Sequence, residues 1–282
     1  MQEPRLMNPR ARSKLISSGS RSLILAAVYI FLFAPIIIVM ATSFDYGERA
    51  YVIFPPERFT FDAYLNIPEY IENGIYLSVG VGISAALGAS LIGIPAALGI
   101  VRSDIPGKSL IMTLFRIPLQ IPGVVMGLAF LQAYYAIGAA TDWYANGTYI
   151  GLVIAHIFAA TPFVIGAVVP VLQRFQPTLE EAAQSLGASR MTTFRKITLP
   201  LIAPGVFAGS LYAFMISFGD VPIAIFLSKP GTSTFPVEVF FALEQEFDTT
   251  ILAASTLVVI FSLMVLLIIQ RFSGLDVFVR TR

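Results

Sequence analysis

The chain has 282 residues, of which 56% are hydrophobic and 12% are charged, and its mean hydropathy is +0.80. A soluble domain usually carries about twice that share of charge, so the composition indicates a membrane protein. A net charge of +1 argues against a nucleic-acid surface, and the absence of Cys excludes disulfides and thiolate metal sites.

Six apolar runs follow one another along the chain, each long enough to cross roughly 30 Å of hydrocarbon as a helix. They cover residues 22–44, 74–101, 109–137, 148–172, 203–227 and 251–270. The first is too long for a signal peptide, and no small-residue cleavage site follows it. We therefore expect an all-α membrane protein with a basic arm (1–21), one six-span domain (22–272) and a short tail (273–282).

Lys and Arg are distributed unevenly between the two sides of these spans. All of them except Arg49, Arg58 and Lys229 fall on the side that holds both termini and the loop at 173–200. Because cytoplasmic loops carry the excess of Lys and Arg, both termini and this loop are predicted to face the cytoplasm.

The most specific motif lies in the loop at 173–200. Glu-Ala-Ala is followed after three residues by Gly, and after nine more by Ile-x-Leu-Pro, at positions Glu181, Ala182, Ala183, Gly187, Ile197, Leu199 and Pro200. The loop is charged and contains helix breakers, although long apolar runs flank it. It must therefore lie in water beside a membrane.

The same loop carries local signals for two short helices. Thr178 and Glu181 have the spacing of a capping box, and Gly187 suits the left-handed position that follows a helix. Ser189 can cap a second helix, and Pro200 is expected to stop that helix before the fifth span. The sequence therefore predicts a helix, a sharp turn and a second helix.

The motif is the one found in binding-protein-dependent permeases, and the chain resembles the membrane subunits of ATP-binding-cassette (ABC) importers over nearly its whole length. The resemblance implies a type I importer permease fold in which the first short helix enters a cleft of an ATPase subunit. The implied coupling residues are Thr178, Glu181, Ala182, Ala183, Gly187, Ile197, Leu199 and Pro200. The alternative is an ordinary capped loop, which would need neither the Ala pair nor the fixed separations.

The resemblance also implies a set of partners. These are two nucleotide-binding ATPase subunits, a second permease that is identical or homologous, and an external solute-binding protein, assembled at a bacterial inner membrane. ATP and Mg²⁺ would be held by the ATPase subunits, with no cofactor or metal on this chain. Gly107-Lys108-Ser109 looks like the end of a phosphate loop, but Arg102 stands where that loop requires Gly.

Asp220 is the clearest carboxylate within a predicted span. A charge there costs about 2.5–3.5 kcal/mol on insertion scales, so it is a functional candidate. Two interpretations stay open: Gly219, Asp220 and Pro222 belong to the solute pathway, or the carboxylate holds a helix break or subunit interface by hydrogen bonds. His156, in the fourth predicted span, is interpreted as a packing residue rather than a ligand.

The branch of the family bears on the substrate. The short basic arm, the six spans and the run at 216–222 resemble spermidine/putrescine permeases, which implies a polyamine or a related amine-bearing compound. The same branch carries iron, thiamine and opine-like compounds. From other classes, an ion-driven secondary transporter should show more spans and inverted repeats, and an enzyme should show a catalytic constellation. The sequence shows neither, and we expect a transport subunit and not an enzyme.

The second predicted span has a small residue at every fourth position, at Ala85, Ala89, Gly93 and Ala97. Small residues allow helix backbones to approach closely in lipid. We interpret this row as packing within the subunit; a pore-lining or subunit-facing role is the alternative.

Overall fold

The computed structural model shows a helical chain. It describes residues 9–45, 53–104, 106–245 and 249–273. Within those ranges every regular element is a helix, in agreement with the predicted all-α class. The first eight residues of the predicted arm, and the predicted tail after residue 273, lie outside the described residues.

The chain forms two compact units. One consists of Met1–Ile67 with Glu246–Ser262, and the other of Pro68–Gln245 with Leu263–Arg282. The division falls within α12 (Thr249–Ser273), the helix on which the sixth predicted span lies. The predicted boundaries of the arm, the permease domain and the tail stay predictions.

In the first unit, α1 (Pro9–Thr42) is the dominant element and already begins inside the predicted arm. Its apolar part ends in a small aromatic cluster with α2 (Asp62–Leu65). A hydrogen bond of 2.6 Å joins the hydroxyls of Ser43 and Tyr64, and the Phe44 ring lies 5.3 Å from the Tyr64 ring between centroids. These contacts fix α2 to the end of α1.

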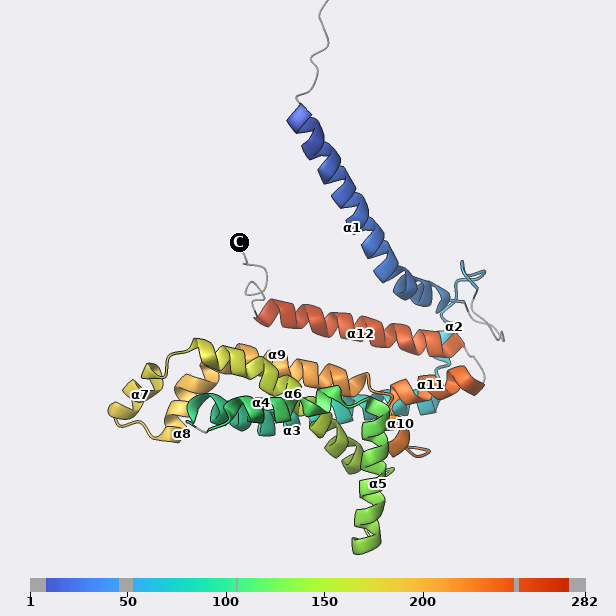
Figure 1. The fold of residues 1–282 in the computed structure, drawn as a ribbon. Coiled ribbons are helices and arrows are strands. Elements are labelled where there is room, and N and C mark those ends of the chain that lie inside the picture. The colour runs from blue at the N-terminus through green and yellow to red at the C-terminus, as the bar shows by residue number, and fades with distance from the viewer. Residues whose placement is uncertain (1–8, 46–52, 105, 246–248, 274–282) are drawn as a thin grey trace, which may run out of the picture. The chain divides into compact units, whose positions relative to one another are not determined.

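The core of the second unit consists of α3 (Glu69–Arg102), α6 (Tyr149–Arg174) and α9 (Leu199–Phe218), which pack side by side (Figure 1). The small-residue row of α3 explains the close approach. Ala89 is fully buried, and a Cβ placed on Gly93 would lie 2.9 Å from the Val164 side chain of α6. The row therefore packs within the subunit, as predicted.

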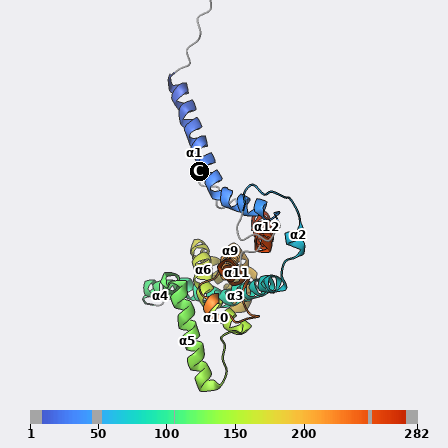
Figure 2. The same ribbon diagram turned by 90° about the vertical axis from the view of Figure 1, so that its right-hand side faces the viewer.

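The third predicted span, 109–137, is not one helix. It divides into α4 (Lys108–Arg116), η1 (Ile117–Gln120, a 3₁₀ turn) and α5 (Gly123–Thr141). Pro118 and Pro122 cause the break because neither has an N–H to continue the helical ladder. Figures 1 and 2 show α5 leaving the direction of α3, α6 and α9.

The fifth predicted span, 203–227, is also interrupted. α9 ends at Phe218, and a separate short helix, α10 (Ala224–Leu227), follows the segment that contains Pro222. Proline restricts the residue before it and cannot donate to the ladder, so the helix does not pass through this point. Asp220 therefore lies in the break and not inside a continuous span, which corrects the prediction.

Beyond α10, α11 (Phe235–Gln245) returns along α3. The amide of Phe235 donates to the hydroxyl of Ser78 at 2.8 Å, and a Cβ on Gly74 would lie 3.2 Å from the Phe235 backbone. The end of the unit that contains α10 and α11 is thus anchored to the first turns of α3.

Within the described residues, five helical stretches are long and apolar enough to span a membrane. They are Arg21–Thr42, Glu69–Arg102, Gly123–Thr141, Tyr149–Arg174 and Arg190–Phe218. The sixth prediction, 251–270, falls on α12, whose described apolar stretch is the shorter Thr249–Val265.

Candidate functional site

The motif at 178–200 forms a helical hairpin at one end of the α3, α6 and α9 bundle (Figure 1). Its two helices are α7 (Thr178–Ser185) and α8 (Arg190–Thr193). We call residues 178–193 the hairpin. It occupies the end of the bundle opposite α10 and α11.

The turn of the hairpin depends on Gly187, which has φ +89°. The amide of Gly187 donates to the Gln184 carbonyl at 2.9 Å, and the amide of Ala188 donates to the Ala183 carbonyl at 3.0 Å. These are the two bonds of a Schellman motif. A side chain at position 187 would meet no atom within 4 Å, so the backbone conformation alone calls for glycine. The predicted turn is confirmed.

The predicted capping box at the start of α7 is wrong. The N-cap is Pro177 and no side chain caps the helix, because Thr178 is already the first helical residue. The amide of Glu181 donates to the Pro177 carbonyl at 3.1 Å, and the Glu181 side chain is exposed. By contrast, Ser189 caps α8 as predicted: its hydroxyl accepts from the Thr192 amide at 3.2 Å.

The predicted helix stop at Leu199-Pro200 is also wrong. α8 continues through a π-helical segment, η2 (Phe194–Thr198), directly into α9. The amide of Leu199 reaches back five residues to the Phe194 carbonyl, and Pro200 occupies the first turn of α9. Proline has no N–H to donate to the helical ladder. The wider hydrogen-bond spacing of the π turn just before Pro200 accommodates this missing donor, so the chain stays helical.

The outer face of the hairpin is apolar and open. Leu179 and Leu186 are 50% and 89% exposed, and Met191 is 58% exposed. Ala182 is exposed between the two leucines and shares their helical face, since positions three, four and seven residues apart align on a helix.

Three of the predicted coupling residues lie deeper, whereas Thr178 and Pro200 are exposed. Ala183 is half-buried in α7, and Ile197 and Leu199 are half-buried where η2 meets α9. Leu199 packs against the buried core of the α3, α6 and α9 bundle. The structure therefore divides the motif into an exposed tip and a packed base.

Sequence reasoning missed two residues at that base, Arg102 and Glu180. Arg102 Nε lies 3.1 Å from Glu180 Oε2, and Arg102 Nη2 donates to Glu180 Oε1 at 3.4 Å. Thr198 Oγ1 donates to the same Oε1 at 2.9 Å. The available signal was the pair of adjacent carboxylates at 180 and 181, because neighbours on a helix point about 100° apart and only one can face the bundle.

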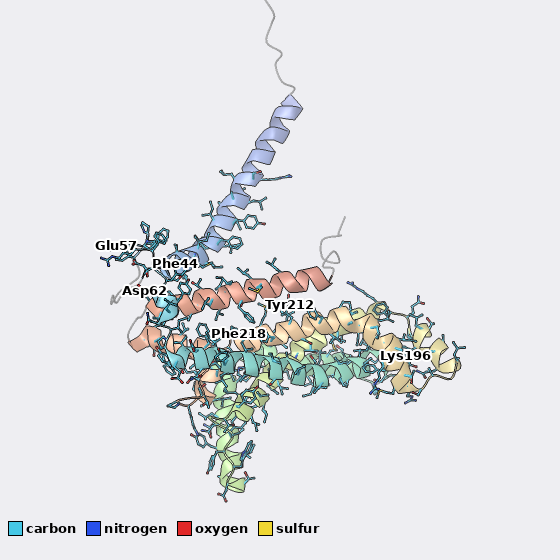
Figure 3. The ribbon with its side chains drawn as sticks, turned by 180° about the vertical axis from the view of Figure 1, so that it is seen from behind. Phe44, Glu57, Asp62, Lys196, Tyr212 and Phe218 are labelled. Carbon is cyan, nitrogen blue, oxygen red and sulfur yellow. The ribbon has the colours of Figure 1, made fainter. Side chains whose placement is uncertain are left out.

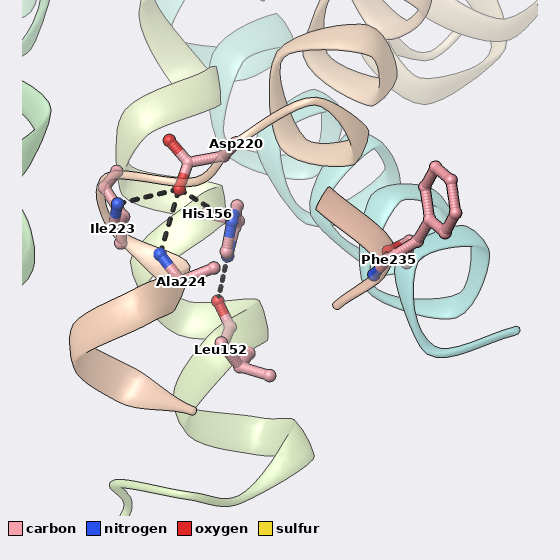
Figure 4. A network of polar contacts seen from close by, with 7 residues as sticks. Leu152, His156, Asp220, Ile223, Ala224 and Phe235 are labelled. Atoms are coloured by element: carbon pink, nitrogen blue, oxygen red, sulfur yellow. Dashed lines mark hydrogen bonds and ion pairs between the residues drawn. The ribbon is translucent and has the colours of Figure 1, made fainter. Parts of the chain in front are cut away.

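At the opposite end of α9, Asp220 sits in a compact polar network (Figure 4). Its Oδ1 accepts from the amides of Ile223 and Ala224 at 2.8 and 3.0 Å, and lies 3.7 Å from His156 Nε2. His156 is buried in α6, and its Nδ1 lies 2.7 Å from the Leu152 carbonyl. Because a carbonyl only accepts, Nδ1 carries the hydrogen of that bond.

The geometry places His156 beside Asp220. Its Nε2 lies 3.7 Å from Asp220 Oδ1, which is beyond hydrogen-bond distance, and Nε2 has no hydrogen-bond partner among the described residues. His156 is therefore a buried packing residue that neighbours the carboxylate. We call His156 and Asp220, with the two amides, the polar break.

The other two pathway candidates flank this network. Gly219 is the exposed C-cap of α9. Pro222 packs against the start of α5, where a Cβ on Gly123 would lie 2.7 Å from the Pro222 ring. The structure thus brings all three candidates together in one segment.

The hairpin and the polar break are connected by α9. Its 20 residues correspond to about 30 Å, the thickness of the hydrocarbon core. Figure 3 shows Lys196 of η2 at one end of this stretch and Phe218 at the other.

Comparison with known proteins identifies the family to which the chain is similar. Residues 89–277 match the family described as binding-protein-dependent transport system inner membrane component. The putrescine transport system permease protein PotI of Escherichia coli K12 is 29% identical over 245 residues, which cover 86% of this chain and 87% of PotI. The spermidine/putrescine transport system permease protein PotC of Haemophilus influenzae is 28% identical over 253 residues, covering 89% and 95%.

Two further similarities define the breadth of the group. The sulfate transport system permease protein CysT of Salmonella typhimurium is 32% identical over 196 residues, covering 64% of this chain and 70% of CysT. In fold, the chain resembles a bacterial ABC transporter that imports the acidic polysaccharide alginate, with a TM-score of 0.73, 16% identity, and coverage of 96% and 99%. The family match takes in most of the chain, including the hairpin and Asp220. The chain therefore belongs to the binding-protein-dependent inner membrane components, the permease subunits of ABC importers, which carry solute and are not enzymes.

Proposed function

We propose that the hairpin is the coupling element of this permease and that α7 docks into an ATPase subunit. The observation that carries the proposal is the open apolar face formed by α7 and its C-cap residue, Leu186. Leu186, at 89% exposure, is the most exposed of the large apolar side chains described, and it lies beside the sharp turn at Gly187. An apolar side chain on a rigid tip is the kind of anchor that fills a pocket in a partner.

The proposed assembly contains two ATPase subunits, a second permease and an external solute-binding protein. ATP and Mg²⁺ belong to the ATPase subunits in this proposal. The family description supports the binding protein. The strong Lys/Arg bias supports an orientation in which both termini and the hairpin are cytoplasmic.

For the substrate, we propose a polyamine or a related amine-bearing compound. Similarity to permeases named for putrescine and spermidine transport supports this class. Similarity to a sulfate permease shows that the fold also serves an anion, so family membership alone does not select a cation. Iron, thiamine and opine-like compounds are the competing substrates within the same importer role.

We place the solute pathway at the segment of Gly219, Asp220 and Pro222. Supporting this placement, the segment is a break in the helix ladder at the end of α9 remote from the hairpin. Asp220 is also the carboxylate at which a cationic solute would gain most. Its Oδ1 already accepts from two amides and faces His156. A solute must therefore compete with these two amides for Oδ1 or bind to Oδ2.

The importer role is tested by co-expressing the chain with its ATPase and binding protein and measuring uptake in proteoliposomes. We expect the ATPase to co-purify with the wild-type permease, and we expect uptake of putrescine or spermidine to require internal ATP. A permease that retains no ATPase and supports uptake driven by an ion gradient would overturn the proposal. ATP-dependent uptake of sulfate with none of polyamines would overturn only the substrate class.

Orientation is tested separately with a single cysteine, since the native chain has none. Leu186→Cys places the thiol at a highly exposed position of the hairpin. We expect an impermeant maleimide to label it in inside-out vesicles and not in intact spheroplasts. Labelling from outside would show that the hairpin is not cytoplasmic.

A further inference from the structure

Polar contacts join α7 to the packed base of the hairpin. In α7, whose residues are all described, none is buried. Among the hydrogen bonds and ion pairs of the described residues, Glu180 is the α7 side chain that reaches α3 and η2. We propose that Glu180, with Arg102 and Thr198, is the link that transmits movement of α7 to α3 and α9. This rests on the proposed coupling function.

The link joins segments that are far apart in the sequence. Arg102 is the last residue of α3, Glu180 lies in the first turn of α7, and Thr198 is the last residue of η2. Arg102 Nη1 also donates to the Phe175 carbonyl just before α7, at 3.4 Å. One guanidinium thus holds both the entry to α7 and the helix itself.

The chemistry of the link makes it stiff. Arg102 and Glu180 side chains are 22% and 18% exposed, so water screens the pair only in part. The Nε contact with Oε2 at 3.1 Å is an ion pair without hydrogen-bond geometry, and Nη2 adds a hydrogen bond of 3.4 Å to Oε1. Each oxygen of Glu180 contacts Arg102, and Oε1 also accepts from Thr198. A shift of α7 must therefore carry both neighbours with it or break several contacts at once.

Thr198 connects the link to the irregular turn at the start of α9. π-helical segments are rare and occur often at functional sites. η2 lies where α8 passes into α9, and its last residue is the one that Glu180 holds. A pull on α7 therefore reaches α9 at its least regular turn, while Arg102 carries the same pull to the end of α3.

This role differs from docking. Docking belongs to the exposed tip at Leu179 and Leu186, whereas the link lies at the partly buried base. Loss of the link should leave the ATPase bound and hydrolysing ATP but should separate hydrolysis from transport. Glu180, Arg102 and Thr198 are positioning residues in this sense, since none of them needs to contact solute or nucleotide.

The test uses the full importer in proteoliposomes, with uptake and ATP hydrolysis measured on the same sample. In Glu180→Gln, we expect the ATPase to co-purify at the wild-type ratio and uptake per ATP to fall about tenfold, the scale of one lost charged hydrogen bond. Thr198→Val, which removes only the hydroxyl, should give a smaller fall. The reversed pair Arg102→Glu with Glu180→Arg should recover part of the loss relative to Glu180→Arg alone.

Asp104→Asn is the matched control, because Asp104 is an exposed carboxylate two residues from Arg102 and no contact of its side chain is seen among the described residues. It should leave uptake per ATP unchanged. Unchanged uptake per ATP in Glu180→Gln would overturn the link and leave the importer role intact. A loss of ATPase from the Glu180→Gln complex, with normal uptake per ATP in the complexes that remain, would also overturn it, since the residue would then only support assembly. Absence of ATPase from the wild-type permease would instead count against the proposed function.

Discussion

The hairpin and the polar break terminate the same helix, α9, yet they treat charge and apolar surface in opposite ways. At the hairpin, apolar side chains such as Leu186 face outward and the ion pair of Arg102 and Glu180 lies at the base. At the polar break, His156 is buried and Asp220 is bonded to nearby amides. A surface that binds a partner leaves apolar side chains exposed to water, whereas a charged group near the membrane interior needs hydrogen-bond partners within the chain.

The first way to break this comparison is Gly187→Pro. Proline requires φ near −65°, whereas position 187 has φ +89° and its amide donates to Gln184. We expect the Schellman turn to be lost and ATP-driven uptake to fall to background. The permease should still insert, because the bundle of α3, α6 and α9 does not include the turn.

Uptake is measured at matched membrane levels of protein, with Gly187→Ala as the control. Alanine keeps the amide donor and pays only the cost of the left-handed conformation, about 1–2 kcal/mol. It should therefore retain a part of the uptake. Wild-type uptake in the proline variant would show that the turn does not matter for coupling.

Asp220 is the corresponding test at the other end of α9. Asp220→Ala removes the acceptor of two amides, so the free energy of unfolding should fall by about 1–3 kcal/mol. Asp220→Asn keeps an acceptor for both amides and removes only the charge. Thermal unfolding in detergent should therefore rank wild type, Asn and Ala in descending stability.

Uptake by Asp220→Asn separates the pathway role from the structural one. If the carboxylate serves a cationic solute, uptake of putrescine should fall while assembly and stimulation of the ATPase by binding protein stay normal. Unchanged uptake would defeat the pathway role, and loss of assembly would assign Asp220 to the structure of the break.

Leu186→Asp tests the exposed side of the comparison. Because the side chain is 89% exposed, the change should alter the free energy of unfolding by less than about 0.5 kcal/mol. Placing a carboxylate in an apolar docking pocket should nevertheless weaken ATPase binding by about tenfold or more. Co-purification at graded detergent and salt, compared with the unfolding midpoint, checks both halves. A destabilised permease with normal ATPase binding would contradict the docking surface.

Local chemistry could be predicted from the sequence wherever a short segment decides it. Gly187 and Ser189 are of this kind, since a left-handed turn and an N-cap each depend on neighbouring backbone alone. The small row of α3 was predictable for a similar reason, as its period places it on one helical face.

The sequence predictions fail where contacts with distant residues, or prolines, outweigh the local hydrophobic pattern. Whether Glu180 or Glu181 turns toward the bundle depends on Arg102, which lies 78 residues earlier. Hydropathy alone predicted unbroken runs at 109–137 and 203–227, and prolines within them override it. At Pro200 the reverse error occurred: a helix stop was predicted, but the π turn at Phe194–Thr198 lets the helix continue through the proline.

The smallest expected effects distinguish the two helix starts of the hairpin. Ser189→Ala should remove the hydroxyl that accepts from the Thr192 amide, at a cost of about 1 kcal/mol to the second helix. Thr178→Ala should cost less than about 0.5 kcal/mol, because no side-chain cap is formed at α7. Hydrogen exchange of the hairpin amides, which reports local opening, should rise near Thr192 in the first variant and stay unchanged near Glu181 in the second. Faster exchange at Glu181 in Thr178→Ala would show that the Thr178 side chain caps α7 after all, in contradiction to the Pro177 N-cap of the structure.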